Sequence, residues 1–340
     1  MNVRSTELQY SKTSSLSVFS IKKIFETLPE FQRQGITELS ISDKQFSYDK
    51  NGILRLISQI KKFCPELFLS ILVSPEILDK TLVQGFQEIY CSLEIPFGGT
   101  EKNGTLLFDK KFYSQKARLL NEAGLVFGFN LDWGIKNGDT FKNFRSRLDF
   151  AVSLYPNHID FPQLEEKPYR EPKPTGIYSS KDLDFSRGMA FACKTFYSEG
   201  RAVPWFCSVI NALKIEASSF FSDFEEFQLC SNCSFETGFD PELAGHKAIE
   251  KLQLLFLKQK FEEKNKMHLF SAVKDIVSLN GAFSRLASEN EESIVETSYN
   301  PDDLLSPCAM NIADFCENVT MESCSVKIFE SDEGLDYKIL

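Results

Sequence analysis

The chain has 340 residues, 42% of them hydrophobic and 25% charged, as is typical of a globular protein with a large core. Apolar runs are too short to cross a bilayer, and the polar N-terminus lacks a secretory signal, so we expect a cytoplasmic protein without a membrane partner. Residues 288–340 hold 13 acidic and 2 basic residues, whereas the rest is nearly neutral. Nucleic-acid binding, which needs a concentrated basic face, is therefore not expected.

The first half of the chain alternates between helix and strand patterns. Apolar spacing predicts a helix from Val18 to Leu28, with Gly35 as its stop signal and Pro29 ending or kinking it. Five apolar runs are predicted as strands, at residues 37–42, 67–73, 88–94, 125–132 and 157–161. Near-continuous apolar strands separated by amphipathic helices predict a parallel sheet buried on both faces. Five strands are too few for a closed barrel, so the fold class is α/β with a partial (β/α) barrel.

Two predicted strands are followed by candidate turn or capping signals. After the strand at 67–73, Ser74 is predicted to cap a helix that begins at Pro75. After the strand at 88–94, the Gly-containing segment 98–104 opens no helix directly, so we do not expect it to cradle a phosphate.

Beyond residue 165 the composition changes, which predicts a domain organisation of a barrel over 1–165, a Pro-rich linker over 166–180, a helical region over 181–287 and an acidic segment over 288–340. The predicted helices are 181–199, 205–213, 217–229, 241–262 and 268–286. The chain should end in a small β-hairpin that turns at Gly334.

Polar residues follow several predicted strands, at the edge where parallel β/α sheets bind ligands. The candidate binding residues are Asp43, Glu94, Asn130, Asp132 and Gln163, and Asp160 also lies at a strand end. Each of these side chains can equally cap a helix or solvate a loop. His158 begins a predicted strand, and we interpret it as structural.

The nine cysteines are an odd count without a signal peptide, a pattern typical of reduced thiols. Cys230 and Cys233 form a Cys-x-x-Cys pair, which supplies half of a zinc site or a redox couple. A zinc site needs further ligands, for which Cys193, Cys207 and His246 are candidates. The redox interpretation lacks the strand–helix context of thioredoxin-like proteins.

Four segments together resemble the barrel of radical S-adenosylmethionine (SAM) enzymes of the cobalamin-binding type, over about residues 4 to 164. They are ISDKQF (41–46), SLEIPFGG (92–99), GIKNGDT (134–140) and RSRLDFAVSLYPNHID (145–160). The resemblance implies a SAM site near Glu94. Ile95 and Pro96 replace the family's small Ser-Gly pair, and Asp139 stands where the family has Glu.

The Cys-x-x-x-Cys-x-x-Cys triplet that holds the family's [4Fe–4S] cluster is missing from the sequence, and Met1 falls about where the family's cluster loop ends. The resemblance therefore implies a truncated, split or degenerate member that binds SAM without cleaving it alone. A separate polypeptide would complete the barrel.

Two other hypotheses stay open. The protein could be a non-catalytic scaffold that uses its acidic tail and the Phe-rich helix from Phe220 to Phe227, in which case those rings should be exposed. Alternatively, it could be a zinc protein centred on Cys230 and Cys233.

Overall fold

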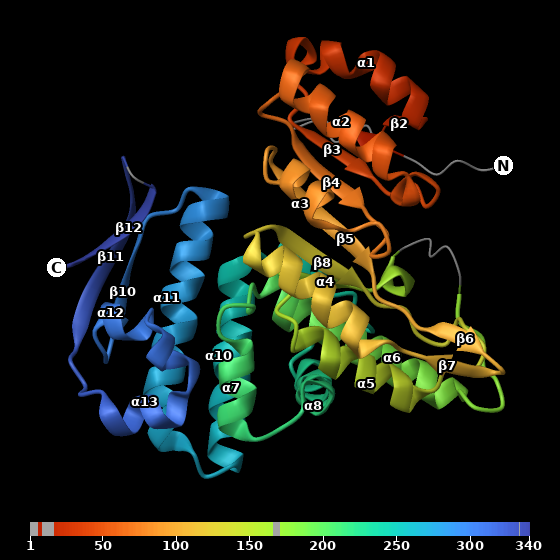
Figure 1. Cartoon of the computed structure of the whole chain (residues 1–340). Coiled ribbons are helices and arrows are strands. Elements are labelled where there is room, and N and C mark those ends of the chain that lie inside the picture. Colours follow the sequence, from red (N-terminus) through yellow and green to blue (C-terminus); the bar gives the residue numbers. More distant parts are fainter. Residues whose placement is uncertain (1–5, 9–16, 166–170, 333) are drawn as a thin grey trace. The chain divides into compact units, whose positions relative to one another are not determined.

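The computed structural model describes residues 6–8, 17–165, 171–332 and 334–340 (Figure 1). The chain forms two compact units. The first holds the described residues up to Asp132, together with 136–138 and 154–162, and the second holds Trp133–Ile135, Asp139–Ser153 and the described residues from Gln163 onward. Among the described residues, no helix is long and apolar enough to cross a membrane.

A seven-stranded sheet forms the centre of the first unit, in the order β2-β1-β3-β4-β5-β8-β9. Its strands are β1 (Thr6–Leu8), β2 (Ser17–Phe19), β3 (Glu38–Ile41), β4 (Phe68–Leu72), β5 (Cys91–Pro96), β8 (Val126–Asn130) and β9 (His158–Asp160). From β3 to β9 every pairing is parallel, whereas β1 is antiparallel to both of its neighbours. The five predicted parallel strands and the mixed α/β class are thus confirmed. The predicted start of the first helix is wrong, because Val18 lies in β2.

The helices of the first unit cover one face of this sheet (Figure 1). They are α1 (Ile21–Gln34), α2 (Lys50–Phe63), α3 (Lys80–Phe86) and α4 (Lys110–Glu122). Each contacts the next, as expected when consecutive parallel strands are joined by right-handed crossovers. α1 continues past Pro29 and ends at Gly35, whose φ of 68° forms a left-handed cap. α3 begins later than predicted, because Asp79 rather than Ser74 caps it by accepting a hydrogen bond from the Leu82 amide.

The two faces of the parallel strands differ in polarity. One face carries apolar side chains that are at most 2% exposed: Leu39, Ile41, Leu69, Ile71, Leu93, Ile95, Phe127, Phe129 and Ile159. The alternate positions carry mainly small or polar residues: Ser40, Ser70, Ser92, Glu94, Gly128, Asn130, His158 and Asp160. The sheet was expected to be buried on both faces, but most side chains on this second face are only half-buried. The strands alternate with period two, as in a sheet with one apolar and one polar face.

A two-stranded hairpin, absent from the predicted elements, follows β5. Strands β6 (Thr100–Lys102) and β7 (Thr105–Leu107) pair across a turn at Asn103 and Gly104, whose φ values are 51° and 72°. Positive φ at both central residues is the requirement of a type I′ turn, for which Asn-Gly is a favoured pair. The hairpin leads to Asp109, which caps α4.

The second unit is mainly helical. Its α-helices are α5 (Phe141–Val152), α6 (Ser180–Cys193), α7 (Phe206–Leu213), α8 (Ala217–Cys230), α9 (Pro241–Ala244), α10 (His246–Glu263), α11 (Phe270–Glu289), α12 (Pro301–Leu304) and α13 (Ile312–Asn318). A π-helical turn over Lys194–Glu199 extends α6. An antiparallel sheet follows, in the order β10-β11-β12, with β10 (Ser293–Thr297), β11 (Cys324–Ser331) and β12 (Gly334–Ile339). The predicted terminal hairpin is confirmed as β11 and β12.

The two compact units group segments from different parts of the chain. Helix α5, which precedes β9 in the chain, groups with the second unit. Within the second unit, β10, β11 and α12 of the acidic segment 288–340 contact α11. Residues 166–170 of the predicted linker lie outside the described residues. The boundaries at 165, 180 and 287 stay predictions.

Candidate functional site

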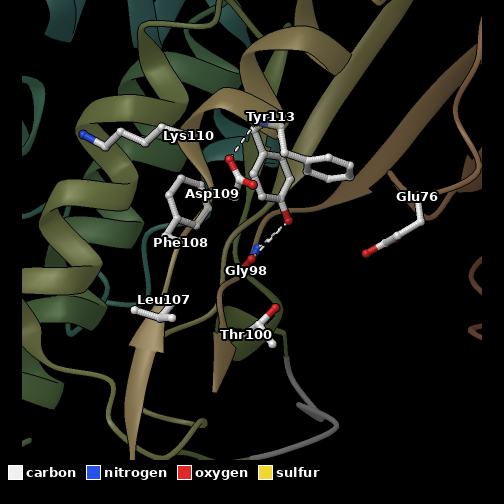
Figure 2. Close-up of a pocket in the computed structure, with 9 residues that line it drawn as sticks. Glu76, Gly98, Thr100, Leu107, Phe108, Asp109, Lys110 and Tyr113 are labelled. Atoms are coloured by element: carbon white, nitrogen blue, oxygen red, sulfur yellow. Dashed lines mark hydrogen bonds between the residues drawn. The ribbon is translucent and has the colours of Figure 1, made fainter. Parts of the chain in front are cut away.

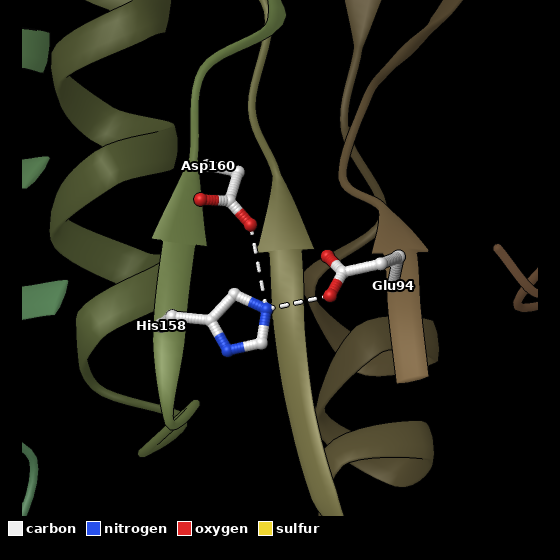
Figure 3. Close-up of side chains that lie close together, drawn as sticks. All are labelled: Glu94, His158 and Asp160. Atoms are coloured by element: carbon white, nitrogen blue, oxygen red, sulfur yellow. Dashed lines mark hydrogen bonds and ion pairs between the residues drawn. The ribbon is translucent and has the colours of Figure 1, made fainter. Parts of the chain in front are cut away.

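Three residues on adjacent parallel strands form a row across the polar face of the first unit. Glu94 of β5 is in register with Gly128 of β8, which is in register with His158 of β9. Neighbouring strands lie about 4.8 Å apart, so Gly128 separates two side chains whose backbones are about 10 Å apart. A Cβ on Gly128 would lie 2.0 Å from His158 Nε2. The missing side chain is therefore what lets the imidazole cross β8 and reach Glu94 (Figure 3).

The imidazole of His158 lies between two carboxylates. His158 Nε2 is 2.8 Å from Glu94 Oε1 and 3.3 Å from Asp160 Oδ2. The three side chains are 23%, 20% and 44% exposed, in the order His158, Glu94 and Asp160, so the cluster opens to solvent on the Asp160 side. The second oxygen of Glu94, Oε2, is buried and has no hydrogen-bond partner among the described residues. The cluster thus offers a negative charge and an unused acceptor to a cation or a hydrogen-bond donor.

Asn130 lies at the carboxyl edge of the same face. It is in register with Pro96 on one side and with Asp160 on the other, and its side chain is half-buried. Asp132, two residues further on, is also half-buried. The structure therefore brings the predicted residues Glu94 and Asn130 to one face of three adjacent strands.

The other two predicted binding residues have local roles. Asp43 is 8% exposed, and its Oδ1 accepts a hydrogen bond from the Phe46 amide at 2.8 Å, within the loop after β3. Gln163 belongs to the second unit, where its amide donates to the Trp133 carbonyl at 3.2 Å. Such side-chain-to-backbone bonds are common for Asp in loops, and a binding role for either residue stays a prediction.

A pocket of about 570 Å³ lies beside the carboxyl end of β5 (Figure 2). Its lining residues are Glu76, Gly98, Thr100, Leu107, Phe108, Asp109, Lys110, Phe112 and Tyr113. The rings of Phe108 and Tyr113 stack at 5.0 Å with an angle of 7°. The Tyr113 hydroxyl accepts a hydrogen bond from the Gly98 amide at 3.1 Å and lies 3.1 Å from the Pro96 carbonyl, so it fixes the loop after β5. The wall of the pocket is therefore rigid and partly aromatic.

Cys230 and Cys233 are placed differently from each other. Cys230 ends α8 and is exposed, whereas Cys233 is buried. Burial raises the pKa of the Cys233 thiol, which is opposite to the shift that favours a metal-binding thiolate. In the described part of the chain, no third His, Cys or carboxylate lies close enough to this pair to complete a metal site. Glu94, His158 and Asp160, by contrast, lie close to one another. The zinc site at Cys230 and Cys233 stays a prediction.

The further zinc ligands considered from the sequence have other surroundings. Cys193 and Cys207 are buried, and the Cys207 thiol lies 3.7 Å from the Val152 carbonyl. His246 Nδ1 accepts a hydrogen bond from Arg285 at 3.0 Å. No three cysteines converge anywhere within the described ranges, so these residues do not fit an iron–sulfur cluster held by three thiolates.

The Phe-rich helix α8 belongs to the core of the second unit. Phe220, Phe221 and Phe224 are all 0% exposed. They pack edge-on or stacked against aromatic rings of other helices, including Phe206 and Phe256. Full burial of these rings counts against the hypothesis that α8 is a partner-binding surface.

The sequence pattern does not single out Gly128 as part of this cluster, and the interpretation of His158 as structural stays a prediction. The available signal was the alternation of the strands, which places Glu94, Gly128 and His158 at positions of the same parity on three consecutive parallel strands. The exact register, however, depends on pairing between segments that are more than thirty residues apart.

The first unit is thus an open parallel α/β sheet with helices on one face and a polar cluster on the other. No protein-family model and no curated protein matches the chain. Two structures of TsrM from Kitasatospora setae, a radical SAM methyltransferase, are similar with a TM-score of 0.35 and 13% identity, over 47% of this chain. One contains cobalamin and a [4Fe–4S] cluster, and the other contains tryptophan and aza-SAM. The chain covers only 33% and 34% of those structures.

Proposed function

We propose that the polar face of the first unit binds SAM or a similar positively charged nucleoside, and that this chain does not cleave it alone. The observation that carries the proposal is the row of Glu94, Gly128 and His158, with Asp160 beside it. This row places two partly exposed carboxylates on one face, and Glu94 Oε2 has no hydrogen-bond partner in the part of the chain that the structure describes. The sequence resemblance to radical SAM barrels names SAM as the first ligand to test.

The chemistry of the cluster suits such a ligand. SAM carries an ammonium group and a sulfonium centre, and a half-buried carboxylate forms strong charge-assisted hydrogen bonds with an ammonium group. Asn130, at the edge of the same face, has both donors and an acceptor for the ligand's carboxylate or ribose. The pocket after β5 adds the half-buried ring of Phe108, against which a purine can pack, while the buried Tyr113 ring supports it from behind.

Cleavage would need an electron from an iron–sulfur cluster, and the described residues bring no three thiolates together. A second polypeptide that extends the sheet would be one way to complete the site.

Calorimetric titration with SAM tests the proposal, with S-adenosylhomocysteine as the ligand that lacks the sulfonium charge. We expect Glu94→Gln to weaken binding by about 10- to 100-fold, because a hydrogen bond to a charged group contributes about 1.5–3 kcal/mol. Glu26→Gln, on the exposed surface of α1, is the matched control and should bind as the wild type does. No heat of binding at several hundred micromolar protein would refute the proposal.

A divalent metal ion is a second candidate ligand, favoured by the spacing of the donor atoms. Cis ligands about 2.1 Å from a metal lie about 3 Å apart. The Nε2–oxygen distances in the cluster are 2.8 and 3.3 Å, and one ligand atom from each residue lies within 4.8 Å of the other two. One imidazole and two carboxylates form a donor set that suits Zn²⁺, Mn²⁺ or Fe²⁺.

Titration with Mn²⁺ and Zn²⁺ separates the metal sites. A metal at the cluster should be lost in His158→Ala and retained in the double variant Cys230→Ser/Cys233→Ser. The reverse result would assign the metal to the cysteine pair. Full retention of binding in His158→Ala would eliminate the cluster as a metal site while leaving SAM binding to be decided by its own titration.

A further inference from the structure

Strand β12 forms an edge of the C-terminal sheet and keeps an apolar strip exposed. Among the described strands it pairs with β11 alone. Leu335 and Ile339 are 48% and 50% exposed. Across the pair, Ile339 is opposite Val326 and Tyr337 is opposite Ile328, and both partners on β11 are fully buried. Leu335, Tyr337 and Ile339 therefore share the core-facing side of the sheet. Tyr337 packs against Phe283 of α11 and its hydroxyl donates to Asp302, whereas Leu335 and Ile339 on either side of it stay exposed.

The backbone groups of the same three residues point outward. The Leu340 amide donates to the Ser325 carbonyl at 2.9 Å, which identifies Leu340 and Ser325 as a hydrogen-bonded pair. Antiparallel pairs alternate between hydrogen-bonded and non-bonded, so Lys338 and Asp336 also bond to β11. Leu335, Tyr337 and Ile339 consequently present their N–H and C=O groups to the open edge.

The charges on β12 are unbalanced within one chain. Lys338 lies directly opposite Lys327 of β11, and like charges in that position are destabilising. Lys327 forms an ion pair with Glu292 at 2.6 Å. Neither Lys338 nor Asp336 forms an ion pair with any residue in the described part of the chain. An acidic group beyond the edge would therefore compensate Lys338.

We propose that β12 pairs with β12 of a second copy of this chain, antiparallel and centred on Tyr337. In this register Asp336 lies opposite Lys338 of the second copy and Lys338 lies opposite its Asp336, while Leu335 and Ile339 face each other in the same reciprocal way. The outward backbone groups are those of the hydrogen-bonded pairs, so the two edges match without a bulge. The contact is isologous and closes as a two-fold dimer, with a continuous six-stranded sheet.

The observations favour a second copy over an unrelated strand because the sequence Leu-Asp-Tyr-Lys-Ile is self-complementary about its centre. A shift of the register between the two β12 strands by one residue would place Leu335 of one copy and Ile339 of the other on opposite faces of the joined sheet. A shift by two residues would separate the Asp336 and Lys338 pairs. The short edge makes a small interface, so the dimer should form in a concentration-dependent way.

Sedimentation velocity of the full chain over a range from about 1 to 500 μM tests the proposal. We expect a monomer–dimer equilibrium for the wild type. Asp336→Lys and Lys338→Asp each place like charges opposite each other in the homodimer, so each variant should dimerise at least about tenfold more weakly. An equimolar mixture of the two variants restores opposite charges at both positions, and the dimer should return.

Glu330→Lys is the matched control, since it makes the same change in net charge as Asp336→Lys at the exposed position of β11, and it should dimerise as the wild type does. A wild type that stays monomeric over the whole range would overturn the proposal. So would a mixture that stays monomeric, or a loss of dimer in Glu330→Lys equal to that in Asp336→Lys. Far-UV circular dichroism verifies that each variant is folded, because all three substitutions are at exposed positions.

Discussion

Replacing Gly128 with Ala gives a direct test of the cluster. The added Cβ would lie 2.0 Å from His158 Nε2, whereas ordinary contacts begin at about 3.4 Å. The imidazole must therefore move by about 1.4 Å or more, which breaks the 2.8 Å contact with Glu94. Loss of a hydrogen bond to a charged group lowers the free energy of unfolding by about 1.5–3 kcal/mol. Ala in place of Gly raises it by about 0.5–1 kcal/mol in a strand. The expected net loss in the free energy of unfolding is about 1–2 kcal/mol.

A double-mutant cycle separates this clash from any other effect of the methyl group. Urea unfolding would be measured for the wild type, Gly128→Ala, His158→Ala and the double variant. Because His158→Ala removes the ring that the methyl group meets, Gly128→Ala should cost nothing, or stabilise slightly, in that background. An equal cost in both backgrounds would refute the inference that Gly128 exists to let His158 reach Glu94.

Three further predictions concern the second unit. Arg147 and Asp139 form an ion pair at 2.8 Å, and both side chains are 2% exposed. Asp139→Ala leaves the buried guanidinium without this carboxylate, so it should lower the free energy of unfolding by about 3–5 kcal/mol in a thermal or urea melt. Phe224→Ala should cost about 3–5 kcal/mol in the same assay, since its ring is fully buried. Burial lowers the pKa of His246 from 6.5 to about 4, so the unfolded chain binds a proton that the folded chain excludes between these values. Stability should therefore fall by about 2 kcal/mol as the pH drops from 6.5 to 4, and His246→Gln should remove that pH dependence.

Much of the fold follows from local sequence patterns. The five parallel strands coincide with short apolar runs, and α1 ends at the glycine that the pattern indicated. The helix after β4 was placed too early because Ser74 and Pro75 have the composition of a helix start. In the structure Asp79 supplies the cap instead, and its carboxylate also pairs with Lys50. Two good capping signals five residues apart cannot be ranked without this tertiary contact.

Pairings between distant segments were harder to predict. β1 and β2 are three residues each, and their sequences carry no alternation long enough to identify a strand. Val18 fits the helical spacing of the residues after it equally well, and the pairing of β2 with β1 decides its conformation. By contrast, the Asn103-Gly104 turn is a local signal, because both residues have the positive φ that a type I′ turn requires.

The candidate site shows the same limit in chemical terms. Glu94 and Asn130 could be predicted because they occupy strand ends, where any parallel sheet exposes polar groups to a ligand. His158 could not, because its importance depends on Gly128, a residue with no functional group. The cluster exists only because three strands pair in one register, and a shift of β9 by one residue would place His158 on the apolar face.

Glycine at the centre of a strand is unfavourable by itself, so its presence between two facing polar side chains indicates close approach across the strand. For open parallel sheets of this kind, a glycine flanked in register by a carboxylate and a histidine is therefore a stronger indication of a site than either polar residue alone.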